Sequence, residues 1–174
     1  MMRWVLWAYL ISMMTPVSAK EVAIEKLTAV YLYQLSRLTT WPESKHNQAD
    51  YFNLCVLSDN PLSKVLETLK TKTIHGKKVS IKYTANIDTI SHCHVLFLDN
   101  KVDNITYAEI AYLSYQHHIL IINKQKHYIK NQWDSIQLFE EQQQLRFSVN
   151  YFAVKRASLQ MSSRLLALAV EVIE

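Results

Sequence analysis

Residues 91–100 read "SHCHVLFLDN", and residues 51–60 read "YFNLCVLSDN". Each stretch contains an apolar run of strand length, and each run carries one of the two cysteines of the chain. Apolar runs without alternation are typical of strands that are covered on both faces, as in a parallel sheet. We therefore read "FNLCVL" (52–57) and "CHVLFLD" (93–99) as central strands of a layered domain.

Segments with helical periodicity separate these runs. The segment at 21–42, "EVAIEKLTAVYLYQLSRLTTWP", has apolar residues at three- and four-residue spacing and stops at Trp41-Pro42, because the residue before a proline avoids helical geometry. Asn60 and Pro61 are suited to begin a second helix in "SDNPLSKVLETLK". A third helix is expected at 106–116. The tail from Tyr151 to Glu174 is expected to be one long helix, whose apolar face carries Val154, Ala157, Met161, Leu165, Leu168 and Val172.

Further strands are expected on either side of the third helix. Gly76 marks a turn into "KKVSIKYT" (77–84), which alternates like a strand, and "HILIIN" (118–123) is fully apolar. The runs at 135–141 and 144–150 form a hairpin around Gln142-Gln143. This order predicts an α/β fold: a three-layer single domain with a mostly parallel sheet, a late antiparallel hairpin and helices on both faces.

The first 19 residues have the layout of a secretory signal peptide. Arg3 is followed by the apolar core from Trp4 to Met14 and by small residues before a cleavage site after Ala19. An uncleaved anchor is the alternative, but the core is shorter than the roughly 20 residues of a membrane span. Removal of 19 of the 174 residues leaves a domain of 155 residues, 20–174, with no later segment expected to enter a membrane.

Export favours a disulfide between Cys55 and Cys93, because an even number of thiols in an oxidising compartment pairs up. Such a bridge stabilises the fold by about 4 kcal/mol in the chain-entropy model. Free thiols and a metal site remain alternatives. Strand alternation would place His92 and His94 together on the face opposite Cys93, so a metal bound by all three needs a distorted strand.

Composition points away from nucleic acid and from catalysis. The net charge is +4, and the lysines between Lys64 and Lys82 are spread over several predicted elements, which indicates solvated side chains and not a continuous basic stripe. Gly76 is the only glycine, so there is no glycine-rich phosphate loop. Ser162-Ser163 are read as small packing residues within the last helix. We expect no enzyme activity, no cofactor and no metal.

Several segments together resemble the YfiR-like family. "AVYLYQLSRLTTWP" is similar to its opening helix with a Trp-Pro end, and "NLCVLSDNP" and "GKKVSIK" resemble its first two strands. "CHVLFLD" resembles its Cys-His strand, and "LRFSVNYFAVKRASLQMSSRLLALA" resembles its closing strand and helix. The segments occur in the family's order over nearly the whole mature chain. Cys55 and Cys93 match the family's cysteine positions.

The resemblance implies a small periplasmic protein that represses an inner-membrane diguanylate cyclase by binding its periplasmic sensor domain, and thereby acts in cyclic di-GMP signalling and biofilm control. It also implies an outer-membrane lipoprotein that sequesters the repressor. The chain departs from the family in two ways. Asn131, Gln132 and Trp133 replace a frequent Gly-Gly pair, and a second cysteine pair found in some members is absent.

Four residues are candidate partner contacts: Trp133, Trp41, Tyr128 and Arg156. The aromatic residues stand at the ends of elements, where binding residues concentrate, and such side chains anchor many interfaces. The plainer interpretations are that the tryptophans close the edge of the core and that Arg156 pairs with Asp134 at the surface. A periplasmic sensor of an aromatic or nucleotide-like ligand is the alternative function. A homodimer is left open.

Overall fold

The structure is a computed structural model that describes residues 17–57, 62–99, 104–129 and 133–174. Most of the predicted signal peptide, together with the predicted helix start at Asn60 and Pro61, lies outside these ranges. Within the described residues, the main sheet has eight strands in the order β10-β8-β7-β6-β5-β2-β4-β3. Their bounds are β2 (Phe52–Leu57), β3 (Thr73–Ile74), β4 (Lys77–Thr84), β5 (Val95–Asp99), β6 (Leu120–Lys124), β7 (Ile136–Glu141), β8 (Gln144–Asn150) and β10 (Val172–Ile173).

Most neighbours in this sheet are parallel, as predicted. β2 pairs in parallel with β4 on one side and with β5 on the other. β6 likewise pairs in parallel with β5 and with β7. The β7–β8 pair is the expected antiparallel hairpin. Its turn at Gln142-Gln143 has positive φ at both residues, 48° and 64°, as a tight two-residue hairpin loop requires. The fold class predicted from the sequence is confirmed.

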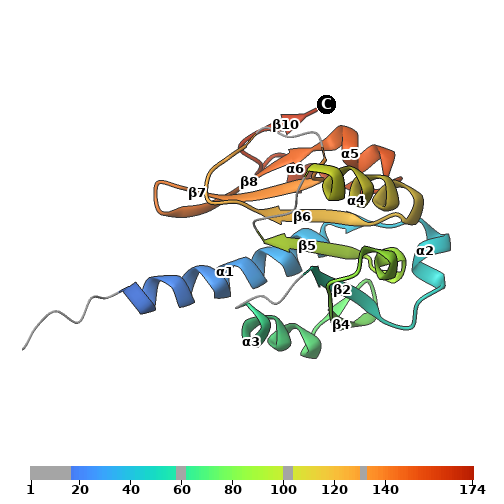
Figure 1. Cartoon of the computed structure of the whole chain (residues 1–174), viewed down its shortest axis with the longest axis horizontal. Helices are drawn as coiled ribbons and strands as arrows, with labels where there is room; N and C mark the ends of the chain where they lie inside the picture. The colour runs from blue at the N-terminus through green and yellow to red at the C-terminus, as the bar shows by residue number, and fades with distance from the viewer. Residues whose placement is uncertain (1–16, 58–61, 100–103, 130–132) are drawn as a thin grey trace, which may run out of the picture.

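One face of the sheet is covered by α1 (Val17–Arg37) and by α3 (Ser63–Leu66) with its 3₁₀ continuation η1 (Glu67–Thr71). Figure 1 shows α1 in blue running along the sheet, with its N-terminal end extending beyond the strands. Alternate strand residues such as Leu54, Val56 and Phe97 point to this side and pack with Leu32 and Leu35 of α1. We call this the α1 face, and it holds the larger apolar cluster of the described residues.

The opposite face is covered by the 3₁₀ helix η2 (Ile87–His92) and by α4 (Asn104–His117). Cys55, Leu96 and Ile121 point to this side and pack with Ile90 of η2 and Ile110 of α4. We call it the α4 face. It also contains buried polar groups: Asn123 donates to the Asp134 carboxylate at 3.1 Å, and Tyr107 hydrogen bonds to the same carboxylate.

The C-terminal tail corrects the sequence prediction. In place of one helix, the chain forms α5 (Tyr151–Arg156), β9 (Gln160–Met161), α6 (Ser163–Leu166) and β10. Helix α5 ends because Ser158 adopts a positive φ of 57°, which breaks helical geometry. Ser162 is therefore not within a helix. It is the N-cap of α6, where its hydroxyl accepts from the Leu165 N–H at 3.2 Å.

The first helix also ends earlier than the Trp-Pro pair, at Arg37. Thr39 and Thr40 form β1 (Thr39–Thr40), which pairs antiparallel with β9 in a separate small sheet. A short helix, α2 (Glu43–Asn47), follows in a polar stretch for which the sequence indicated no helix. The expected helices at 58–70 and 106–116 are present where the structure describes them. In the described part of the chain, no helix is long and apolar enough to span a membrane.

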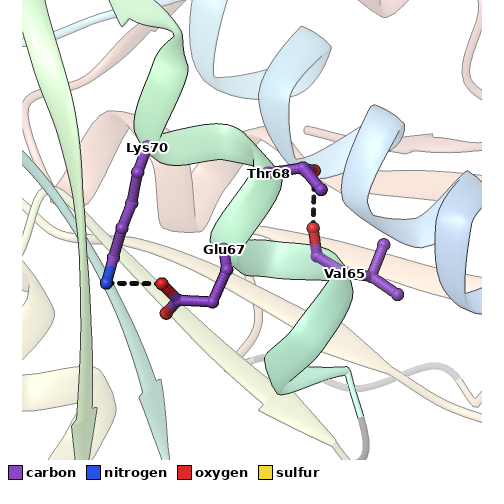
Figure 2. Close-up of polar contacts among 4 residues, drawn as sticks. All are labelled: Val65, Glu67, Thr68 and Lys70. Carbon is purple, nitrogen blue, oxygen red and sulfur yellow. Dashed lines mark hydrogen bonds and ion pairs between the residues drawn. The ribbon is translucent and has the colours of Figure 1, made fainter.

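The turn from α3 into η1 is closed by local polar contacts. Figure 2 shows the Thr68 hydroxyl donating to the Val65 carbonyl at 2.6 Å and the Lys70 ammonium pairing with the Glu67 carboxylate at 2.6 Å. Both charged side chains are about half exposed, so the pair contributes about 0–1 kcal/mol. The burial of Leu66 and Leu69 against the α1 face is what holds this segment to the sheet.

Candidate functional site

Cys55 and Cys93 form a disulfide, as the sequence predicted. Cys55 lies in the central strand β2, and Cys93 follows directly after η2, with a Cα–Cα distance of 5.8 Å. Both residues are fully buried within the α4-face cluster. The bridge therefore fastens the 3₁₀ helix η2 to the middle of the sheet.

The two histidines beside Cys93 lie on different faces, which corrects the prediction from strand alternation. Residues 92–94 precede β5, so the period-two rule does not apply to them. His92 lies near the bridge, with its ring nitrogen and both sulfurs within 4.8 Å of one another. His94 is fully buried on the α1 face, stacked on Phe52 at 4.7 Å between ring centroids. His92 and His94 therefore cannot share one metal ion in this arrangement.

The sulfur atoms next to His92 are tied into the bridge. Because metals bind the thiolate, Cys55, His92 and Cys93 can offer three ligands only after reduction. Burial is the main cause that lowers the pKa of the His92 imidazole, and the charges of Lys82 and Lys45 lower it further. The charges of Lys45 and Lys82 thus lie near enough to His92 to act on its ring.

Trp41 follows β1 in the chain, before α2, and its side chain lies in the core. Its ring is 7% exposed and packs edge-on against Phe52 at 5.1 Å, and its indole N–H donates to the His94 carbonyl at 3.2 Å. These contacts make Trp41 part of the α1-face core, the plainer of its two interpretations. A partner could reach only a small part of its ring.

Tyr128 and Trp133 lie near the antiparallel hairpin. The Tyr128 hydroxyl donates to the Glu171 carboxylate, and its ring lies 5.2 Å from that of Phe139. Burial, followed by the hydrogen bond and charge of Glu171, raises the pKa of Tyr128 to about 12. Trp133 is partly buried and packs against the α4-face cluster. Both rings therefore pack against other side chains of the fold and are also partly exposed at the surface.

Arg156 lies in an exposed aromatic patch. Its guanidinium is 4.4 Å from the ring centroid of Tyr115 on α4 and 5.7 Å from that of Phe152 on α5. We call Tyr115, Phe152 and Arg156 the Arg156 patch. The Phe152 side chain is 52% exposed, and Arg156 is exposed as well. Asp134, the partner considered for Arg156 from the sequence, is buried against Tyr107 and Asn123.

An apolar groove that the sequence did not indicate lies along one side of α1. It has a volume of about 290 Å³ and is formed where α1, β8 and α6 meet. The Tyr31 hydroxyl donates to the Leu145 carbonyl at 2.9 Å and closes one wall. The main apolar side chains of the groove are Val30, Tyr31, Leu38, Phe147, Leu165 and Leu168.

The fold and the crosslink define a small disulfide-bonded α/β domain with a mostly parallel sheet. Residues 25–170 match the family model described as YfiR/HmsC-like, and the chain therefore belongs to this family. Proteins of this family are known as periplasmic regulators of diguanylate cyclases.

Among solved structures, the chain is similar to a conserved domain protein from Vibrio cholerae, with 14% sequence identity and a TM-score of 0.47. The match covers 76% of this chain and 60% of that chain. No curated protein matches the sequence.

Proposed function

We propose that this protein is a periplasmic regulatory binding protein that restrains an inner-membrane diguanylate cyclase by binding the periplasmic sensor region of the enzyme. Family membership over residues 25–170 is the observation that carries this proposal. An outer-membrane lipoprotein that sequesters the regulator is its second proposed partner. A regulator of this kind acts through affinity, so a few side chains should dominate its contact surface.

The Arg156 patch supports the proposal as a contact surface. Arginine and large aromatic residues are enriched among the side chains that contribute most to interfaces. Arg156 is held over Tyr115 at 4.4 Å, so little side-chain freedom is left to lose on binding. Trp133 and Tyr128 are further candidates, but their rings also contact the fold. Arg156 and Phe152 therefore give the cleaner test.

The cellular test is deletion of the gene followed by measurement of cyclic di-GMP. Loss of a repressor releases the cyclase, so the cyclic di-GMP level and biofilm formation should rise. Reintroduction of the wild-type gene should reverse both changes. An unchanged cyclic di-GMP level in the deletion strain, with the candidate cyclase expressed, would contradict the proposal.

The binding test compares variants against the periplasmic region of the cyclase. Arg156→Ala and Phe152→Ala should each weaken the complex by about 2 kcal/mol, roughly 30-fold in Kd, because truncation of an anchor has effects of this size. Arg164→Ala removes the same charge from an exposed position on α6 and should leave Kd unchanged. Equal affinity of all three variants and the wild type would exclude the Arg156 patch.

Export is part of the proposal. The mature protein should begin at Lys20 and be recovered from the periplasm, because Ala19 ends the small-residue cleavage site. Intact-mass measurement of the purified protein checks this start. A membrane-bound protein that retains Met1 would show an uncleaved anchor instead.

A further inference from the structure

A second pocket, of about 300 Å³, lies on the α4 side of the sheet at the amino ends of β2 and β5. Its position is opposite to the carboxyl edge, where open α/β sheets usually bind their ligands. Lys45 comes from α2, Lys82 from β4, and His92 from the end of η2. The other lining residues are Gln48, Ala49, Asp50, Tyr51, Asn53 and Ser91.

Lys45 is the buried cation of this pocket. Its side chain is only 9% exposed, and its ammonium donates to the Ser91 carbonyl at 2.6 Å. A carbonyl dipole does not neutralise a full charge, and buried charges in proteins are normally paired. Among the described residues, no carboxylate forms an ion pair with Lys45. Desolvation lowers the pKa of Lys45 to about 8, so the position lacks a neutralising negative charge.

Lys82 and His92 face the same space, and Lys82 brings a second positive charge. The charges of Lys82 and Lys45 both act on the His92 ring, which places the three groups around one volume. Asn53 fixes the pocket wall, since its side-chain amide donates to the His92 carbonyl at 2.9 Å. Asp50 is the acidic residue of the lining, and its side chain is exposed. The cationic side chains outnumber the acidic ones.

We propose that this pocket binds a small multivalent anion carrying a phosphate or dicarboxylate group, with Lys45 and Lys82 as its principal contacts. A volume of about 300 Å³ is at the lower end of the range for small-molecule sites. Ammonium groups bind phosphate and carboxylate oxygens through short, charge-assisted hydrogen bonds. Tyr51, 52% exposed at the rim, can cover the organic part of such a ligand. The proposal does not depend on the regulatory function proposed above.

The experiment is equilibrium dialysis of the purified full-length mature protein against radiolabelled sulfate, with sodium chloride holding the ionic strength constant. Sulfate remains a dianion across the working pH range, so only the protein titrates. We expect one saturable site. Lys45→Met, which keeps the side-chain length, should weaken sulfate binding at least tenfold, and Lys82→Gln should weaken it severalfold. Lys78→Gln is the matched control on the same strand, outside the pocket, and should change Kd less than twofold.

Asp50→Asn separates a binding site from simple structural damage. Removal of the carboxylate from the lining should strengthen sulfate binding severalfold, and a misfolded variant would not bind more tightly. Absence of saturable binding, or the same Kd in the wild type and in the variants at positions 45, 50 and 82, would overturn the proposal. Titrations with methyl phosphate and with succinate then decide which of the two head groups the pocket prefers.

Discussion

The two faces of the sheet are held in different ways. On the α1 face, long apolar side chains from α1, η1 and the strands pack into one continuous cluster. The α4 face has a smaller apolar cluster, and it adds the Cys55–Cys93 bridge and the buried Asp134 carboxylate with its hydrogen bonds. Apolar packing responds little to redox state or pH, whereas a disulfide responds to redox state and a buried carboxylate responds to pH. The α4 face should therefore be the redox-responsive side of the protein.

The largest expected effect comes from breaking the bridge on the α4 face. Cys55→Ser should lower the free energy of unfolding by about 4 kcal/mol, because the open chain regains the entropy of a loop of 38 residues. Urea denaturation measures the loss. The Cys55→Ser/Cys93→Ser double variant should match the single variant, since both remove the same crosslink. Thiol titration that finds two reactive cysteines in the native wild type would contradict the bridge.

Leu54, the neighbour of Cys55 in β2, tests the α1 face. Leu54→Ala should cost about 3 kcal/mol, because it leaves a cavity among fully buried apolar side chains. This variant should still lose stability when a dithiol reductant is added, whereas Cys55→Ser should not. Leu168→Ala, at a position 65% exposed, is the control and should change stability by less than about 0.5 kcal/mol. A Leu54→Ala loss below 1 kcal/mol would mean that the α1 face is not the main core.

The buried polar contacts of the α4 face should contribute less to the free energy of unfolding than the bridge or the packing of Leu54. Tyr107→Phe removes the hydroxyl that bonds to Asp134 and should cost about 1.5 kcal/mol, the usual size for a hydrogen bond to a charged group. Burial and the neighbouring Asp134 charge both raise the pKa of Tyr107, so its hydroxyl stays protonated. Tyr112→Phe, on the same helix at a position 62% exposed, should be neutral in urea denaturation. Equal losses in the two variants would show that the Tyr107 bond adds nothing.

A further expected effect is a pH dependence at Lys45, which faces Lys82, His92, Asp50 and Tyr51. Its folded-state pKa of about 8 lies below the value of about 10.4 for an unfolded lysine. Between these values the unfolded chain binds more protons, so the destabilisation that this buried ammonium causes becomes smaller as the pH rises. The stability of the wild type relative to Lys45→Met should thus increase from pH 7.5 to 9.5. A constant difference between the two proteins would contradict the lowered pKa.

The sequence predicted the central strands best. The bounds of β2 and β8 agree with the predicted runs, because an uninterrupted apolar run between polar turns leaves few alternatives. The prediction of one long helix for the C-terminal tail was wrong, because its apolar pattern did leave an alternative. Its apolar residues recur at helical spacing, yet the positive φ at Ser158 and the cap at Ser162 divide it into short elements. A serine three residues before a buried leucine was the available signal for the second helix start.

The candidate sites were harder to predict, because they combine residues far apart in the sequence. Lys45, Lys82 and His92 come from three elements, and the basic stretch gave no sign that Lys82 faces Lys45. The contact between Arg156 and Tyr115 joins α5 to α4 in the same way. Only the disulfide was accessible from the sequence, since two cysteines allow a single pairing.

The Cys55–Cys93 bridge encloses a whole segment of the chain, from β2 through α3, η1, β3, β4 and η2 to Cys93, which directly follows η2. A protease that cuts the backbone within this segment cannot release a fragment, because both ends remain covalently attached at the sulfurs. The nicked protein should migrate as one molecule in electrophoresis without reductant and separate into two pieces with it. Damage in this part of the protein thus stays hidden until the bridge is reduced.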